Sequence, residues 1–60
     1  MASNYVIDNN ELIINDEIEE GVKIYDLDGS LIYSGREKKI RLNQGIYILI
    51  FDQCVHKIKI

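Results

Sequence analysis

The residues with the most reactive side chains are Cys54 and His56, the only cysteine and the only histidine among the sixty residues. A Cys-x-His pair could in principle bind a metal or couple a nucleophile to a base. Two ligands are too few for a structural metal, and same-face neighbours on a strand lie about 7 Å apart. We therefore expect Cys54 to be a small apolar residue beside a turn, and His56 to be partly buried with a backbone hydrogen-bond partner. An exposed Cys54 could instead link two chains by oxidation.

The densest group of carboxylates lies in "NDEIEEG" (15–21), which contains Asp16, Glu17, Glu19 and Glu20. A calcium loop needs several oxygen ligands that converge, often with Asp-x-Asp-x-Asp spacing and a glycine. This segment has the charge of such a loop but lacks the spacing. The sequence predicts a polar loop here, with weak calcium or carbohydrate binding as an alternative function.

No other group of residues indicates catalysis. Gly29, Gly35 and Gly45 belong to separate turns and do not form a phosphate-binding loop. The formal net charge of −3 disfavours nucleic acid as a partner, although the positive charges after residue 35 could steer some other partner. We predict a protein that is not an enzyme and that uses no cofactor.

Size and composition point to one small β domain. Sixty residues bury only about 60% of the surface that the unfolded chain exposes, and one cysteine allows no disulfide within the chain. This small size raises the prospect of homo-oligomerisation. The apolar residues, 47% of the total, are mainly Ile, Val, Leu and Tyr, which favour strands. No run is long and apolar enough to insert directly into a membrane, and "MASNYVIDNN" does not resemble a secretory signal.

Short apolar or alternating segments are separated by Asn, Asp and Gly, and the chain contains no proline. We expect strands within the ranges 4–8, 11–15, 22–28, 31–34, 36–43, 46–52 and 54–60. Short strands at such regular spacing predict an all-β fold, either a β-sandwich or a small barrel. Asp28-Gly29, between two of these strands, is a strong signal for a tight hairpin, because both residue types tolerate positive φ.

The last two segments carry the clearest patterns. "IYILIFD" (46–52) is apolar on both faces, which predicts a central strand that is covered on both sides. In "CVHKIKI" (54–60), lysines alternate with apolar residues, so Lys57 and Lys59 should face solvent and blunt the edge of a sheet. The opposite face, which contains Ile58 and Ile60, needs a cover.

Two blocks of the sequence together resemble the C-terminal sorting domain of the type IX secretion system, which ends many secreted proteins of Bacteroidetes-type bacteria. The family pattern runs approximately V-x-I-Y-D-x-x-G-x-L-V, then L-P-x-G-I-Y-I-V-x-I, and last a lysine-bearing strand. The first block is matched by Val22, Ile24, Tyr25, Asp26, Gly29 and Leu31. The second block is matched by Leu42, Gly45, Ile46, Tyr47 and Ile48, and the terminal strand by Lys57, Lys59 and Ile60. Asn43 stands where the second block of the family has proline.

The resemblance implies a small immunoglobulin-like β-sandwich of about six to seven short antiparallel strands. Such domains are recognised by the outer-membrane export machinery, and in many cargo proteins they are then replaced by a surface lipid anchor. On this basis we expect structural roles for Asp26, Gly29, Gly45 and Tyr47. Contacts with a protein partner are expected from Lys57, Lys59 and Ile60.

The resemblance covers residues 9–60, and residues 1–8 are expected to be an N-terminal strand or an extension foreign to the domain. If the chain ends a longer exported protein, its location is outside the cell or on the cell surface. If Met1 is the native start, the location is the cytoplasm. A free-standing structural protein that self-associates through strand edges is an alternative to the sorting function.

Overall fold

The structure is a computed structural model that describes residues 4–15 and 17–60. The described residues form no helix, and therefore none long and apolar enough to cross a membrane. They form seven strands: β1 (Tyr5–Asp8), β2 (Glu11–Ile14), β3 (Val22–Asp26), β4 (Leu31–Gly35), β5 (Lys39–Arg41), β6 (Ile46–Phe51) and β7 (Cys54–Lys59). The all-β prediction is confirmed, and each predicted segment corresponds to one strand. The segment 31–34 is one residue too short, because Gly35, predicted to belong to a turn, pairs with Val22 as the last residue of β4.

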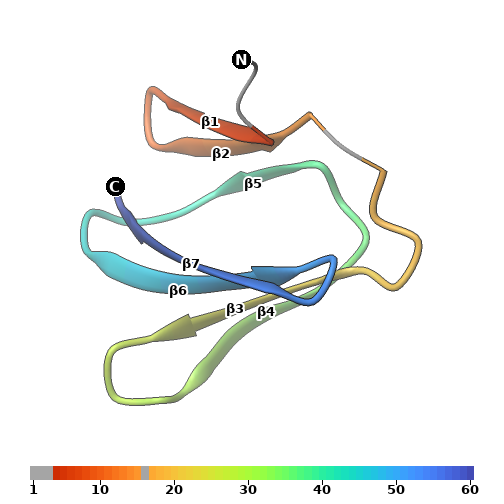
Figure 1. Cartoon of the computed structure of the whole chain (residues 1–60). Helices are drawn as coiled ribbons and strands as arrows, with labels where there is room; N and C mark the ends of the chain where they lie inside the picture. The colour runs from red at the N-terminus through yellow and green to blue at the C-terminus, as the bar shows by residue number, and fades with distance from the viewer. Residues whose placement is uncertain (1–3, 16) are drawn as a thin grey trace.

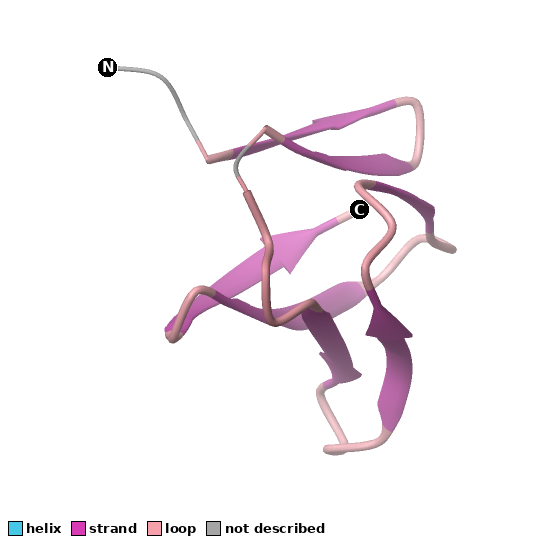
Figure 2. Ribbon diagram, turned by 90° about the vertical axis from the view of Figure 1, so that its right-hand side faces the viewer, coloured by secondary structure: helices cyan, strands magenta, loops and turns pink. Residues whose placement is uncertain are grey.

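The strands form two antiparallel sheets, one with the order β1-β2-β5 and the other with the order β4-β3-β6-β7. Figure 1 shows the first sheet above the second. The β1–β2 and β3–β4 hairpins lie at opposite ends of the molecule in both Figure 1 and Figure 2. In an immunoglobulin constant domain the fourth strand belongs to the sheet of the first two strands. Here β4 pairs with β3 instead, so the fourth strand belongs to the other sheet of the predicted immunoglobulin-like sandwich.

The core lies between the two sheets and contains side chains from both. Leu12 of β2, Ile24 of β3 and Leu49 of β6 are completely buried. The rest of the buried cluster consists of Ile14, Ile18, Val22, Ile40, Leu42, Tyr47, Phe51 and Ile58. Ile58, whose face of β7 was predicted to need a cover, is covered by this packing.

Strand β6 lies inside the second sheet, hydrogen-bonded to β3 on one side and to β7 on the other. Its position is as predicted, but the prediction that both faces are covered is wrong. Leu49 and its inward neighbours are buried, whereas Ile46 is 37% exposed and Ile48 and Ile50 are only partly buried. The physical reason is that the described chain supplies two layers, so each sheet has one face without a cover.

Of the three hairpin turns in the described chain, only the one at Asp28-Gly29 differs from the prediction. Asn9-Asn10 (φ 53° and 64°) and Asp52-Gln53 (φ 52° and 61°) form two-residue turns in which both residues have positive φ. At the Asp28-Gly29 hairpin only Gly29 has positive φ (87°), and the loop has three residues. This is the pattern of a type I turn followed by a left-handed glycine.

The acidic segment is a loop, as predicted, in residues 17–21. Ile18 packs into the core from this loop, and Gly21 N–H donates to the Ile18 carbonyl at 3.0 Å. One apolar side chain therefore fixes a segment whose other side chains are mainly carboxylates. Asp16 lies outside the described residues.

Substitutions on the two faces of β6 test whether only one face is covered. We expect Leu49→Ala to lower the free energy of unfolding by about 2–5 kcal/mol, because it leaves a cavity between the sheets. Ile48→Ala, on the opposite face, should cost only about 1 kcal/mol, because less apolar surface is lost from the folded state. Urea denaturation monitored by circular dichroism measures both. Equal costs for the two substitutions would show that both faces are covered.

Candidate functional site

The two reactive side chains do not form a reactive pair. Cys54 is exposed beside the Asp52-Gln53 turn, whereas His56 is half-buried. The His56 ring stacks on Phe51 at 5.2 Å and meets Tyr5 edge-on at 5.3 Å, measured between ring centroids. The predicted partial burial is confirmed. The predicted hydrogen bond is not made at Nε2, which is buried without a partner among the described residues because aromatic rings surround it.

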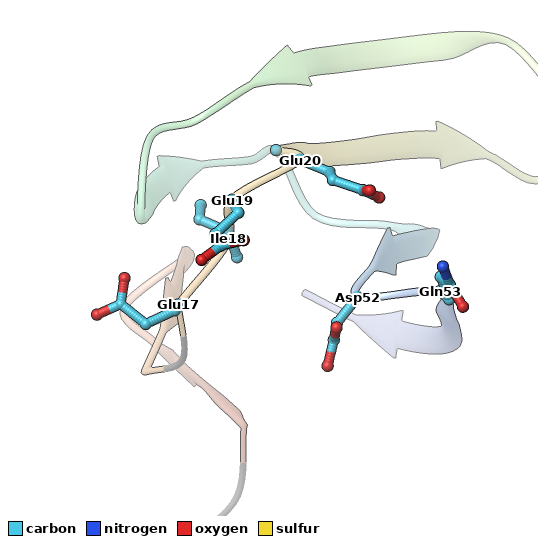
Figure 3. A pocket seen from close by; sticks show the side chains of 7 residues that line it. Glu17, Ile18, Glu19, Glu20, Asp52 and Gln53 are labelled. Carbon is cyan, nitrogen blue, oxygen red and sulfur yellow. The ribbon is translucent and has the colours of Figure 1, made fainter.

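The acidic loop lines an open hollow of about 310 Å³ together with the β6–β7 turn. Its lining consists of Glu17, Ile18, Glu19, Glu20, Gly21, Asp52 and Gln53. Asp52 was not part of the predicted acidic cluster, and the fold brings it there. Figure 3 shows the carboxylates of Glu17, Glu20 and Asp52 pointing in different directions. No group of three or more His, Cys, Asp or Glu within residues 4–15 and 17–60 is arranged to hold a metal ion. The geometry therefore does not favour the calcium alternative.

Asp26 and Gly29 lie in the β3–β4 hairpin. One oxygen of the Asp26 carboxylate accepts hydrogen bonds from the backbone N–H groups of Asp28 and Ser30, both at 2.9 Å. The Asp26 backbone also pairs with Ser30 and Gly29, at 3.0 and 3.1 Å. Gly29 supplies the positive φ that closes the loop, a conformation that other residues adopt at a cost. Both residues thus shape the end of this hairpin.

Gly45 and Tyr47 lie together at the other end of the second sheet. The Tyr47 hydroxyl donates to the Asn43 carbonyl at 2.8 Å, across the bend that leads into β6. Gly45 N–H donates to the Ile60 carbonyl at 3.3 Å, and Ile60 N–H donates to the Gly45 carbonyl at 2.8 Å. These bonds hold the start of β6 against the end of β7.

The three predicted contact residues do not share one surface. Lys57 and Lys59 are exposed on the side of β7 that faces away from the core. Ile60 is half-buried and packs against the core, and both its backbone groups bond to Gly45. Ile60 therefore contributes to the structure, while the two lysines are available for contacts.

The lysines belong to a larger surface, which we call the outer sheet face. Strand register places Leu31, Tyr25, Ile48 and Lys57 in one row across the second sheet. Neighbouring rows contain Lys23, Ile50 and Val55, and Ile46 with Lys59. The outer sheet face thus consists of Lys23, Tyr25, Leu31, Ile46, Ile48, Ile50, Val55, Lys57 and Lys59.

The centre of the outer sheet face consists of the partly exposed Tyr25, Ile48 and Ile50. Apolar side chains on the two edge strands extend it, because Val55 of β7 is 67% exposed and Leu31 of β4 is 53% exposed. A continuous exposed apolar surface of this kind often marks an interaction site. This face was not predicted, because residues 46–52 are apolar on both sides and were expected to be covered on both. No local pattern indicates its exposure, since the number of layers depends on how the strands are distributed between the sheets.

Comparison of the chain with known protein families, curated proteins and solved structures finds no match. The features of the chain that bear on its function are therefore the geometry of the outer sheet face and the residues that resemble the sorting domain.

The Asp26 carboxylate provides a test of the predicted structural role. We expect Asp26→Ala to lower the free energy of unfolding by about 1–2 kcal/mol, because two backbone N–H groups lose an ionised acceptor. Asp28→Ala is the matched control, since it removes the same charge from the same loop without removing a hydrogen bond. Chemical denaturation of both variants measures the difference. Equal stability of the two variants would contradict a structural role for the Asp26 side chain.

Proposed function

We propose that this chain is a non-catalytic recognition module that directs an exported protein to the type IX secretion machinery. A protein of that machinery would contact the outer sheet face. The observation that carries the proposal is the apolar surface outside the central strand β6, flanked by Lys23, Lys57 and Lys59. A protein exported by means of such a module would be located outside the cell or at the cell surface.

The composition of the outer sheet face suits a protein contact. Protein interfaces combine an apolar centre, often with aromatic residues, and a polar or charged rim. Tyr25 and Ile48 lie side by side in the middle of the face, while Lys57 follows in the same row at the edge strand.

The residues that resemble the sorting domain divide into two sets in the structure. The residues of one set have structural roles: Ile24, for example, packs in the core, and Gly29 closes the β3–β4 hairpin. The other set lies on the outer sheet face and consists of Tyr25, Leu31, Ile46, Ile48, Lys57 and Lys59. Packing between the sheets does not require this second set, which supports a role in binding.

Export of a reporter tests the proposal. The full chain, fused to the C-terminus of a neutral periplasmic reporter, should carry it across the outer membrane of a bacterium with an active type IX system. Immunoblots of the medium and the cell surface measure the exported fraction. The Leu49→Ala fusion is the control for folding, because it keeps every side chain of the outer sheet face but destabilises the sheet that carries them. Retention of the unchanged fusion in the periplasm would contradict the proposal.

Self-association remains a second candidate function, because Val55 leaves apolar surface exposed at the edge strand β7. Edge-to-edge pairing of two β7 strands would bring Lys57 and Lys59 of each copy towards those of the other. Like charges at such positions oppose pairing.

We therefore expect the chain to be a monomer at high micromolar concentration and moderate salt. Light scattering coupled to size-exclusion chromatography measures the molar mass, with a reductant present so that Cys54 cannot link two chains. A stable dimer under these conditions would favour self-association over recognition of a partner.

A further inference from the structure

Strand β7 is the longest regular free edge in the described part of the chain. It has six residues and pairs with β6 residue by residue without a shift. The other three edge strands are less suitable for accepting another strand. β1 has four residues and β5 has three, while β4 pairs with β3 through an irregularity in register. Bulged or short edges resist the addition of a strand.

The register determines which backbone groups of β7 are free. The two-residue turn makes Phe51 and Cys54 a hydrogen-bonded pair, and Gly45 and Ile60 exchange bonds at the other end. Hydrogen-bonded and non-hydrogen-bonded pairs alternate in an antiparallel ladder. The backbone groups of Val55, Lys57 and Lys59 therefore point away from β6, where no strand of residues 4–15 and 17–60 lies.

The same three residues place their side chains on the outer sheet face. In an added antiparallel strand, the residue directly opposite each of them would put its side chain on that face too. Carboxylates opposite Lys57 and Lys59 would form ion pairs across the strands, and an apolar side chain opposite Val55 would cover exposed surface. A second copy of β7 would instead offer lysines, so charge complementarity favours an acidic partner.

We infer that β7 accepts an extended acidic segment of a partner protein as an additional antiparallel strand, with the pattern acidic-x-acidic-x-apolar opposite Lys59, Lys57 and Val55. This inference rests on the proposed recognition function and specifies the chemistry of the partner. Main-chain hydrogen bonds would supply affinity, and the two lysines would set the register.

A synthetic peptide, Thr-Glu-Val-Glu-Val-Val-Thr, tests the inference with the full chain. At millimolar peptide and low salt, we expect slower amide hydrogen exchange at Val55, Lys57 and Lys59, measured by NMR. The K57E/K59E variant should bind roughly tenfold more weakly, because two attractive cross-strand pairs become repulsive. The K38E/K39E variant makes the same change of charge at exposed residues away from β7 and should bind as the unchanged chain does.

Methylation of the peptide backbone separates strand addition from simple charge attraction. Methyl groups on the two glutamate nitrogens, which would face β7, should abolish binding. Methyl groups on the two valine nitrogens that follow each glutamate, which would point away from β7, should leave it largely intact. Absence of binding by the unmodified peptide, or equal binding by both methylated peptides, would overturn the inference.

The reporter fusion separates this inference from the proposed function. If K57E/K59E loses the peptide but is still exported like K38E/K39E, the export machinery does not contact the β7 edge. The inference then fails for the partner in export, while the proposed function stands. If the unchanged chain binds the peptide but is not exported, the proposed function fails and the acidic-strand site remains.

Discussion

The contact between the two sheets buries Leu12 of β2 and Leu49 of β6 completely, and the described chain offers no further layer to cover what remains. Each sheet therefore has one face in the core and one face towards solvent. In β5 and in the second half of β7 this division matches the sequence, because Lys39, Arg41, Lys57 and Lys59 occupy the outer positions. In β6 it does not, since Ile46, Ile48 and Ile50 point outwards. The exposed apolar surface is thus a direct result of placing the most apolar strand in a two-layer fold.

Local patterns in the sequence were sufficient to predict the seven strands and the side of β7 that faces solvent. Alternation in "CVHKIKI" (54–60) predicted that Ile58 lies on a face that needs a cover and Lys57 on the face towards solvent. In the structure Ile58 is buried and Lys57 is exposed. The number of layers could not be predicted in the same way, because it depends on how the strands are distributed between sheets. That distribution decides whether Ile48 is covered, and no residue near Ile48 encodes it.

The turns show a similar limit. Asp28-Gly29 has the composition of a two-residue turn, yet the Asp26 carboxylate favours a longer loop by accepting two backbone hydrogen bonds. Asp52-Gln53 lacks glycine, yet the pairing of β6 with β7 holds both residues at positive φ. The roles of Lys57 and Lys59 as surface residues were predictable, whereas the use of Ile60 in holding Gly45 was not. The residue types of a turn therefore do not determine its conformation where a side-chain acceptor or a long strand ladder fixes the backbone dihedral angles.

The pairing of β3 with β6 has a consequence for how the chain folds. Three ladders join strands that are neighbours in sequence, whereas Ile24 meets Leu49, and Leu12 meets Ile40, only after the chain between them closes into a loop. Closing these two loops loses conformational entropy before the contacts stabilise the fold, so it should set the folding rate. Without proline, the chain has no slow isomerisation phase to obscure this barrier in stopped-flow traces.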